Sequence, residues 1–338
     1  MKLPSGQIKK IAVFRALQLG DMLCAIPAIH ALRNAYPNAE ITLLGLPWAK
    51  WMVERFDNYF DRLIHFPGFP GLPEQVFNPI AFAEFLPLIQ REQFDLALQM
   101  QGNGSIVNSM IELFGAKYTA GYQIEGHYAR DNNLFMSYPN EGSEIDRHIA
   151  LMEFLGIPSQ GNALEFPINA MDFQELDYLA LSIEKGRYVC IHPGSRGAWR
   201  QWPTEHFASL GDFCYEKGYK IIVTGTKDEA HIANEVIEQM SNEAIDATGK
   251  TSIGAVAALI KDSALLISNC TGVSHIAAAL KTPSIVISMD GEPERWGPIN
   301  KQLHRTINWL QSPNFDEVFR ETAYLVNQLD SGVLLPQG

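Results

Sequence analysis

Several loops carry side chains that could act on a phosphate-bearing substrate. In the first half, Asp21 follows Gly20 at the start of a predicted helix. A carboxylate there either caps the helix or serves as a general base. In the second half, Ser195, Arg196 and Arg200 lie in a glycine-containing loop after an apolar run. Hydroxyl, guanidinium and backbone N–H groups can together hold a diphosphate, although the same residues could form an ordinary exposed loop.

Two further polar segments follow apolar runs of the second half. Residues 268–275 combine a tight turn at Gly272 with the start of a helix, whose first amides could face an anion. Residues 225–229 include Asp228 and Glu229, either of which could bind a pair of ribose hydroxyls. The structural alternative is a capped helix start in the first case and a carboxylate favoured in the first helical turn in the second.

Several common motifs are missing from the sequence. Gly102 and Gly104 have no third glycine three residues on, so they are not a dinucleotide fingerprint. The chain has no phosphate loop of the G-x-x-x-x-G-K-[ST] type, no G-x-S-x-G nucleophile elbow and no D-x-D after a strand. The four cysteines are scattered, which predicts neither a zinc site nor a disulfide framework. We therefore expect no catalytic metal.

The elements that position these loops alternate along the chain. Short apolar runs predict buried parallel strands at Ile11–Phe14, Ile41–Leu44, Asp95–Gln99, Val189–His192, Ile221–Thr224, Leu265–Ser268 and Ser284–Ser288. Amphipathic patterns predict helices at Met22–Ala35, Thr204–Lys217 and Glu229–Met240. This alternation is typical of an α/β fold, in which ligands bind at the carboxyl ends of the strands.

The length of 338 residues favours two domains, and the strand–helix pattern stops and restarts between residues 165 and 187. We place the first domain at 1–172 and the second at 173–312. A C-terminal helix at about 313–338 can pack back on the first domain.

Composition excludes several function classes. The net charge of −12 argues against a nucleic-acid-binding face, which needs clustered positive charge. No apolar run reaches the roughly 20 residues of a membrane span, and the cysteine pattern favours a reducing, cytoplasmic location.

Five segments, taken in order, resemble glycosyltransferase family 9, the ADP-heptose:lipopolysaccharide heptosyltransferases. They are LGDMLCAIPAIHALRNAYPNAEI, FDLALQMQGNGSIVNSMIELFGAKYTAGY, IHPGSRGAWRQWP, ATGKTSIGAVAALI and NCTGVSHIAAALKTPSIVI. The resemblance implies a GT-B fold, with two Rossmann-like domains whose parallel sheets face each other across a cleft. It implies an inverting, metal-independent transfer of a sugar, expected to be a heptose from ADP-heptose, to a hydroxyl of lipopolysaccharide core or another glycan.

The resemblance also assigns roles to residues. The acceptor is expected in the first domain and the nucleotide-sugar in the second, with no cofactor besides this donor substrate. Asp21 matches the aspartate of the family's L-G-D motif, its general base, and Arg200 matches a basic residue near the diphosphate, usually lysine. The donor side comprises Ser195, Arg196, Glu229 (with Asp228 as the competing register), Thr251, Cys270, Thr271, Gly272, Val273 and His275. The acceptor side comprises Arg15, Gln18, Gly20 and Gln101.

One position departs from the family pattern. The family commonly reads D-T-G-x-x-H, whereas this chain has Cys270 at the first position. A thiol cannot accept two sugar hydroxyl hydrogen bonds as a carboxylate does, so the reaction class is better defined than the sugar. Two alternatives stay open: a nucleotide-sugar-binding protein without transferase activity, and a nucleotide-sugar epimerase on the same fold. The expected partners are a nucleotide-sugar and a glycan or glycolipid acceptor, with peripheral contact at the cytoplasmic face of the inner membrane.

Overall fold

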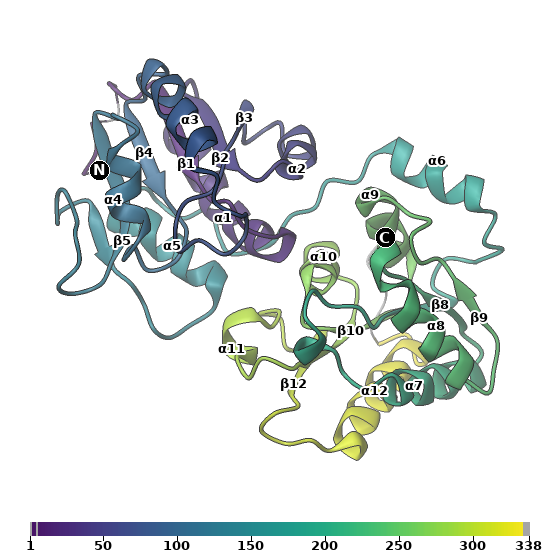
Figure 1. The fold of residues 1–338 in the computed structure, drawn as a ribbon. Helices are drawn as coiled ribbons and strands as arrows, with labels where there is room; N and C mark the ends of the chain where they lie inside the picture. The colour runs from purple at the N-terminus through teal and green to yellow at the C-terminus, as the bar shows by residue number, and fades with distance from the viewer. Residues whose placement is uncertain (1, 5, 334–338) are drawn as a thin grey trace. The chain divides into compact units, whose positions relative to one another are not determined.

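The computed structural model describes residues 2–4 and 6–333. The chain divides into two compact units, Met1–Ala163 and Leu164–Gly338 (Figure 1). The division comes before the predicted boundary at residue 172, which falls within helix α6 (Ala170–Leu179). Helix α6 packs on α9 (Ile253–Asp262) of the second unit. The carboxylate of Glu175 on α6 accepts hydrogen bonds of 2.6 Å from both the backbone N–H and the hydroxyl of Ser252, so the whole helix belongs with the second unit.

The first unit is built on a six-stranded sheet with the order β3-β2-β1-β4-β5-β6, in which every pairing is parallel. The strands are β1 (Lys10–Phe14), β2 (Glu40–Gly45), β3 (Arg62–His65), β4 (Leu96–Gln99), β5 (Tyr118–Gln123) and β6 (Phe135–Ser137). The helices are α1 (Leu19–Ala35), α2 (Ala49–Arg55), α3 (Pro79–Arg91), α4 (Val107–Glu112) and α5 (Glu144–Phe154).

The second unit repeats this plan with a six-stranded parallel sheet of order β12-β11-β10-β7-β8-β9. Its strands are β7 (Tyr188–His192), β8 (Lys220–Val223), β9 (Ala244–Asp246), β10 (Leu265–Asn269), β11 (Ser284–Ser288) and β12 (His304–Asn308). Besides α6 and α9, its helices are α7 (Thr204–Glu216), α8 (Ala230–Gln239), α10 (Gly272–Leu280), α11 (Pro293–Trp296) and α12 (Phe315–Asp330), with short 3-10 turns η1 (Ala198–Arg200) and η2 (Lys227–Glu229).

The two parallel sheets confirm the predicted α/β fold. Each predicted strand is present to within a residue, because long buried apolar runs have few alternatives to a strand covered on both faces. The sequence missed β3, β5, β6, β9 and β12. Strand β9 has only three residues and is half-buried throughout, so it carries no apolar run.

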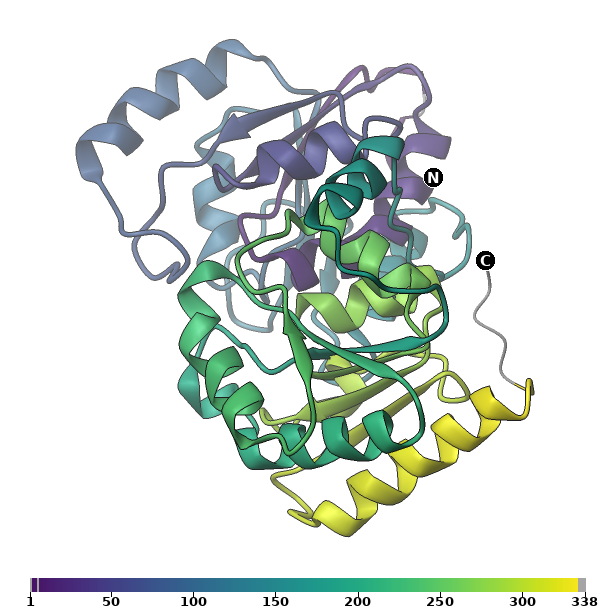
Figure 2. The same ribbon diagram turned by 90° about the vertical axis from the view of Figure 1, so that its right-hand side faces the viewer.

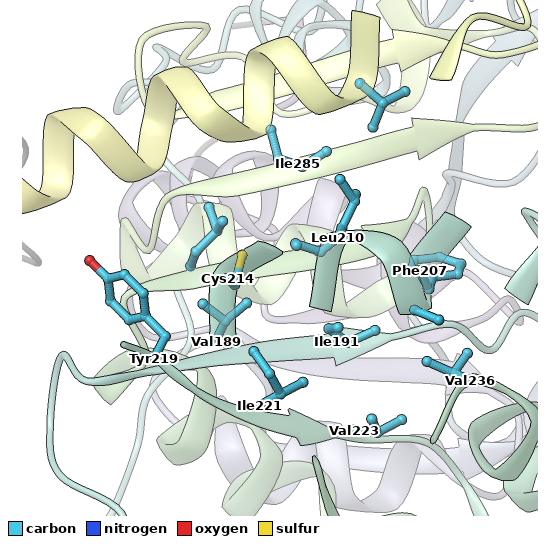
Figure 3. Packing of buried hydrophobic residues seen from close by; sticks show 14 of the residues in the cluster. Val189, Ile191, Phe207, Leu210, Cys214, Tyr219, Ile221, Val223, Val236 and Ile285 are labelled. Atoms are coloured by element: carbon cyan, nitrogen blue, oxygen red, sulfur yellow. The ribbon is translucent and has the colours of Figure 1, made fainter. Parts of the chain in front are cut away.

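The core of the second unit shows how helices cover its sheet. Figure 3 shows Leu210 and Phe207 of α7 facing Ile191 of β7, and all three are fully buried. Helix α12 joins this core through Val318, Leu325 and Val326, and it packs on α7 and β11 (Figure 2). The structure thus differs from the prediction that the C-terminal segment packs on the first domain: the apolar face of α12 is buried on its own unit. Residues 334–338 of that predicted segment lie outside the described residues.

The buried position of Leu210 predicts a stability effect. Leu210→Ala should lower the free energy of unfolding of the second unit by about 2–5 kcal/mol, because the truncation leaves a cavity in a packed core. Leu310→Ala is the matched control, since Leu310 is 60% exposed. Urea unfolding followed by tryptophan fluorescence reports this unit, which holds Trp199, Trp202, Trp296 and Trp309 of the six tryptophans. Equal losses from the two substitutions would contradict the packing described.

Candidate active site

The chain reverses its direction of strand addition between β1 and β4, so the loops after these neighbouring strands diverge. In open parallel sheets such a switch point is where ligands bind. The amide of Gln101, after β4, accepts a 2.7 Å hydrogen bond from the N–H of Ala16, after β1. Gln101 is 4% exposed. It therefore ties the two loops together, whereas the sequence predicted a residue of the acceptor side.

The glycines of the loop after β4 serve its turn. Gly104 has a φ of +91°, and a Cβ at this position would lie 2.3 Å from the carbonyl oxygen of Tyr122. No other residue fits there without displacing the backbone. This is a structural reason for the Gly102-x-Gly104 spacing that did not match a dinucleotide fingerprint.

Asp21 lies in the first turn of α1. The helix begins at Leu19 with Gln18 as its N-cap, so Asp21 is its third residue and not the cap itself. One carboxylate oxygen of Asp21 accepts a 3.3 Å hydrogen bond from the N–H of Gln18. The side-chain amide of Gln18 in turn donates to Glu74 at 2.7 Å. Gly20 lies between these residues, so the predicted Gln18, Gly20 and Asp21 are brought together at the switch point.

The surroundings of Asp21 raise the pKa of its carboxyl group. Burial is the largest cause, and the negative charges of Glu144 and Glu74 act in the same direction. The positive charge of Arg15 and the Gln18 N–H oppose them without cancelling them. A carboxylate whose pKa is raised binds a proton more strongly, which is the property required of a general base.

Arg15 has an internal role. Its side chain is 1% exposed. The guanidinium donates to the carbonyl oxygen of Asp21 at 2.9 Å and to that of Met100, and it lies 3.4 Å from a carboxylate oxygen of Glu144. These bonds hold the loop after β1 in place. The donors of Arg15 are therefore directed into the protein, and its predicted place on the acceptor side stays a prediction.

The second unit has the same kind of switch point between β7 and β10. Asn269 ends β10, and its side-chain amide donates to the carbonyl oxygen of Pro193 at 2.7 Å and accepts from the N–H of Trp202 at 3.0 Å. Both partners belong to the segment after β7. The predicted phosphate loop is thus fastened at each end, with Ser195 buried and Arg196 exposed between the two bonds.

Arg200 lies in η1 and forms an ion pair with Asp290, which follows β11. The other oxygen of Asp290 accepts hydrogen bonds from the Ser288 hydroxyl at 2.8 Å and the Glu292 N–H at 3.1 Å. Burial alone would raise the pKa of Asp290, but the bonds from Arg200, Ser288 and Glu292 outweigh it and lower the pKa. The Arg200 side chain is 33% exposed and so can also reach a ligand.

Residues 270–273 form the turn into α10. The thiol of Cys270 donates to the carbonyl oxygen of Trp296 at 3.6 Å, and burial raises its pKa to about 12, so the group is neutral. Helix α10 begins at Gly272, followed by Val273 and the buried His275. Among the described residues, the buried Thr271 hydroxyl has no hydrogen-bond partner. The first amides of α10 and this hydroxyl together suit an anion.

Glu229 and Asp228 differ clearly in position. One oxygen of the Glu229 carboxylate accepts from the N–H and the hydroxyl of Thr226, both at 2.8 Å. The other lies against the loop after β7, since a Cβ on Gly194 would come within 2.3 Å of it. Asp228 is exposed. The geometry therefore favours Glu229 as the carboxylate beside the predicted phosphate loop.

Thr251 lies in the loop that leads from the end of strand β9 to helix α9. Within the part of the chain that the structure describes, its buried hydroxyl has no hydrogen-bond partner, and neither has the hydroxyl of Thr248. Unused polar groups of this kind are costly unless a ligand or water satisfies them.

Sequence reasoning missed Asp290 and Glu144. Asp290 directly follows a predicted strand, so the strand-end rule applied to every strand would have found it. Glu144 begins α5, far along the chain from Asp21, and no sequence pattern indicates that its charge acts on Asp21.

Within the described part of the chain, no group of three or more His, Cys, Asp or Glu side chains is arranged to hold a metal ion. No helix of residues 2–4 and 6–333 has the length and apolar character needed to cross a membrane.

Comparisons with known proteins bear on the family and the fold of the chain. The chain is 24% identical to lipooligosaccharide heptosyltransferase 2 of Haemophilus ducreyi over 317 residues, which cover 87% of each protein. Its fold matches the crystal structure of a family 9 glycosyl transferase from Veillonella parvula with a TM-score of 0.80 at 20% identity, covering 97% of this chain and 100% of the other. It matches E. coli ADP-heptose LPS heptosyltransferase II with a TM-score of 0.75 at 19% identity, covering 96% and 100%.

These likenesses show that the two units have the GT-B fold. The model of glycosyltransferase family 9 (heptosyltransferase) matches residues 84–325, which is more than half of the chain. The sequence resemblance is therefore confirmed, and the chain belongs to glycosyltransferase family 9 and is a glycosyltransferase.

Proposed function

We propose that this glycosyltransferase transfers a heptose from ADP-heptose to a hydroxyl of a lipopolysaccharide-type glycan, with inversion at the anomeric carbon. The observation that carries the proposal is the Asp21 carboxylate with its raised pKa at the strand-end switch point of a family 9 chain. The names of the relatives in H. ducreyi and E. coli support the heptose and the ADP-linked donor.

Asp21 is the general base of the proposed reaction. It removes the proton of the acceptor hydroxyl as that oxygen attacks the anomeric carbon, and the bond from this carbon to the diphosphate oxygen breaks. Attack opposite the leaving group inverts the anomeric configuration. Gln18 and Gly20 lie beside Asp21 on the acceptor side.

The second unit holds the donor in this proposal. The diphosphate takes on negative charge as it leaves, and Arg200, Arg196 and the first amides of α10 stabilise that charge. The hydroxyls of Ser195 and Thr271 add hydrogen bonds. Glu229 binds the ribose hydroxyls, and Thr251 contacts the base. Cys270 presents a neutral thiol toward the sugar.

Because the chain belongs to a family of glycosyltransferases, we propose neither of the two alternatives, an epimerase or a binding protein without activity. A glycolipid acceptor places the reaction at a membrane surface. A cytoplasmic location with peripheral contact at the inner membrane therefore remains part of the proposal.

An ADP-release assay tests the function directly. The purified protein should release ADP from ADP-heptose when lipopolysaccharide with a truncated core is added, and should release little without this acceptor. UDP-glucose and UDP-N-acetylglucosamine are the matched donors that should give no transfer. Equal turnover of a UDP-sugar, or ADP-heptose turnover that is independent of the acceptor, would contradict the proposal.

Asp21→Asn should reduce kcat by roughly 10²–10⁴-fold, because an amide cannot take the proton. Binding of ADP, measured by calorimetry, should be unchanged. Because the folded-state pKa of Asp21 is raised, ionised Asp21 destabilises the fold at neutral pH. The variant should therefore unfold at a higher temperature at pH 7, with the gain fading as the pH falls through the folded-state pKa. Full activity would exclude Asp21 as the base.

The pair Glu229→Gln and Asp228→Asn separates the two ribose candidates. Glu229→Gln should weaken ADP binding by roughly 10–100-fold, because hydrogen bonds to a charged group contribute about 1.5–3 kcal/mol. Asp228→Asn should leave the affinity unchanged, since Asp228 is exposed. Calorimetric titration with ADP measures the affinity of each variant. Thermal unfolding of Glu229→Gln checks whether weaker Thr226–Glu229 hydrogen bonds have destabilised the fold. A larger effect from Asp228→Asn would reverse the assignment.

A further inference from the structure

A buried carboxylate lies behind the proposed base. Glu144 is the first residue of α5, which packs along α1, and it is 6% exposed. One of its oxygens lies 3.4 Å from the Arg15 guanidinium and 3.4 Å from the His148 ring, and the other lies 3.5 Å from Arg147. Glu144 thus lies at the centre of a buried charged cluster, and this cluster includes Arg15, whose guanidinium also binds the backbone of Asp21.

The contacts of Arg15 show where that cation is directed. Arg15 donates to the backbone carbonyl of Asp21, whereas the side-chain partner of its guanidinium is Glu144. Among the described residues, the hydrogen bond to the Asp21 carboxylate comes from the backbone N–H of Gln18. Arg15 therefore stands beside the base without forming an ion pair with it.

We propose that Glu144 is a positioning residue for the transfer reaction: it holds the Arg15 guanidinium away from the Asp21 carboxylate and balances its charge, so that Asp21 remains a strong proton acceptor. This inference rests on the proposed role of Asp21 as the base. An Arg15–Asp21 ion pair would favour the ionised carboxylate and make it a poorer base. Glu144 prevents this by giving Arg15 another carboxylate.

Other charged and titratable groups face this cluster from the neighbouring elements. Glu74 approaches Gln18 and adds negative charge near Asp21. From β5, the Tyr122 hydroxyl lies 2.9 Å from His148 and donates to the Arg147 carbonyl at 3.0 Å, and burial raises the pKa of Tyr122, which keeps it neutral. Arg147 donates to the carbonyl oxygen of Asn140 at 2.8 Å and to the Tyr138 hydroxyl at 3.3 Å. Because Arg147 has Asn140 and Tyr138 as further partners, Glu144 is the carboxylate that offsets the positive charge of Arg15.

The test is the pH dependence of transfer by Glu144→Gln in the full-length protein. The rate constant kcat/KM falls at low pH as the base becomes protonated. In Glu144→Gln, Arg15 is no longer offset and lowers the pKa of Asp21, so this acid limb should move to lower pH. At pH 7 kcat should fall roughly tenfold, because a weaker base accelerates the reaction less. The KM for ADP-heptose should be unchanged.

Glu153→Gln is the matched control, since it removes the same charge from an exposed position of α5. Glu144→Asp keeps the charge but withdraws it from Arg15, and its acid limb should lie between those of the wild type and Glu144→Gln. If Glu144→Gln does not fold, the position of the Glu144→Asp limb decides alone. A limb at the wild-type pH in either variant, with activity lost equally at every pH, would show a purely structural role and overturn the inference.

The activity of Asp21→Asn separates the two proposals. An inactive Asp21→Asn together with an unmoved acid limb in Glu144→Gln overturns the role of Glu144 and leaves the base assignment intact. A fully active Asp21→Asn overturns both.

Discussion

The candidate site depends on a constraint of open parallel sheets. Where the order of strands reverses, two neighbouring strands send their loops in opposite directions, and the backbone groups beyond the strand ends lose their ladder partners. In each unit, one side-chain amide forms hydrogen bonds with backbone groups of these loops. Gln101 ties the loops after β1 and β4, and Asn269 ties the loops after β7 and β10. Asp21 lies a few residues beyond the first bond and Ser195 beside the second, so both depend on these amides for their positions.

The two switch points differ in charge although their backbones are alike. In the first unit the residues around the loop are carboxylates, namely Asp21, Glu74 and Glu144, and the cation Arg15 is buried among them. In the second unit the loops present Arg196, Arg200 and the amides of α10. A carboxylate environment suits proton removal from a neutral hydroxyl, and a cationic one suits a diphosphate. In the proposed function, the two units therefore share one sheet architecture but take different chemical roles.

The sequence predicted what local pattern controls and missed what requires the tertiary fold. Buried strands were predictable because an apolar run such as Val189–His192 has few other stable conformations, whereas β9 has too few apolar residues to be distinguished from a loop. The strand-end rule predicted Asp21 and Arg200 as site residues from the positions of their loops, and their roles stay predictions. It could not say that Arg15 is directed inward, because the partner that holds it, Glu144, lies 129 residues away in sequence.

The departure at Cys270 has an electrostatic explanation in its neighbour. The charge of Asp290 contributes to raising the pKa of the Cys270 thiol, which places the two groups close together in a buried environment. A carboxylate at position 270 would add a second negative charge beside Asp290, close to Arg200, which already pairs with Asp290. Two close carboxylates cannot both stay ionised without cost. A neutral thiol avoids that repulsion. Residues 270 and 290 are therefore best considered as one unit, in which position 290 carries the carboxylate and Arg200 compensates it.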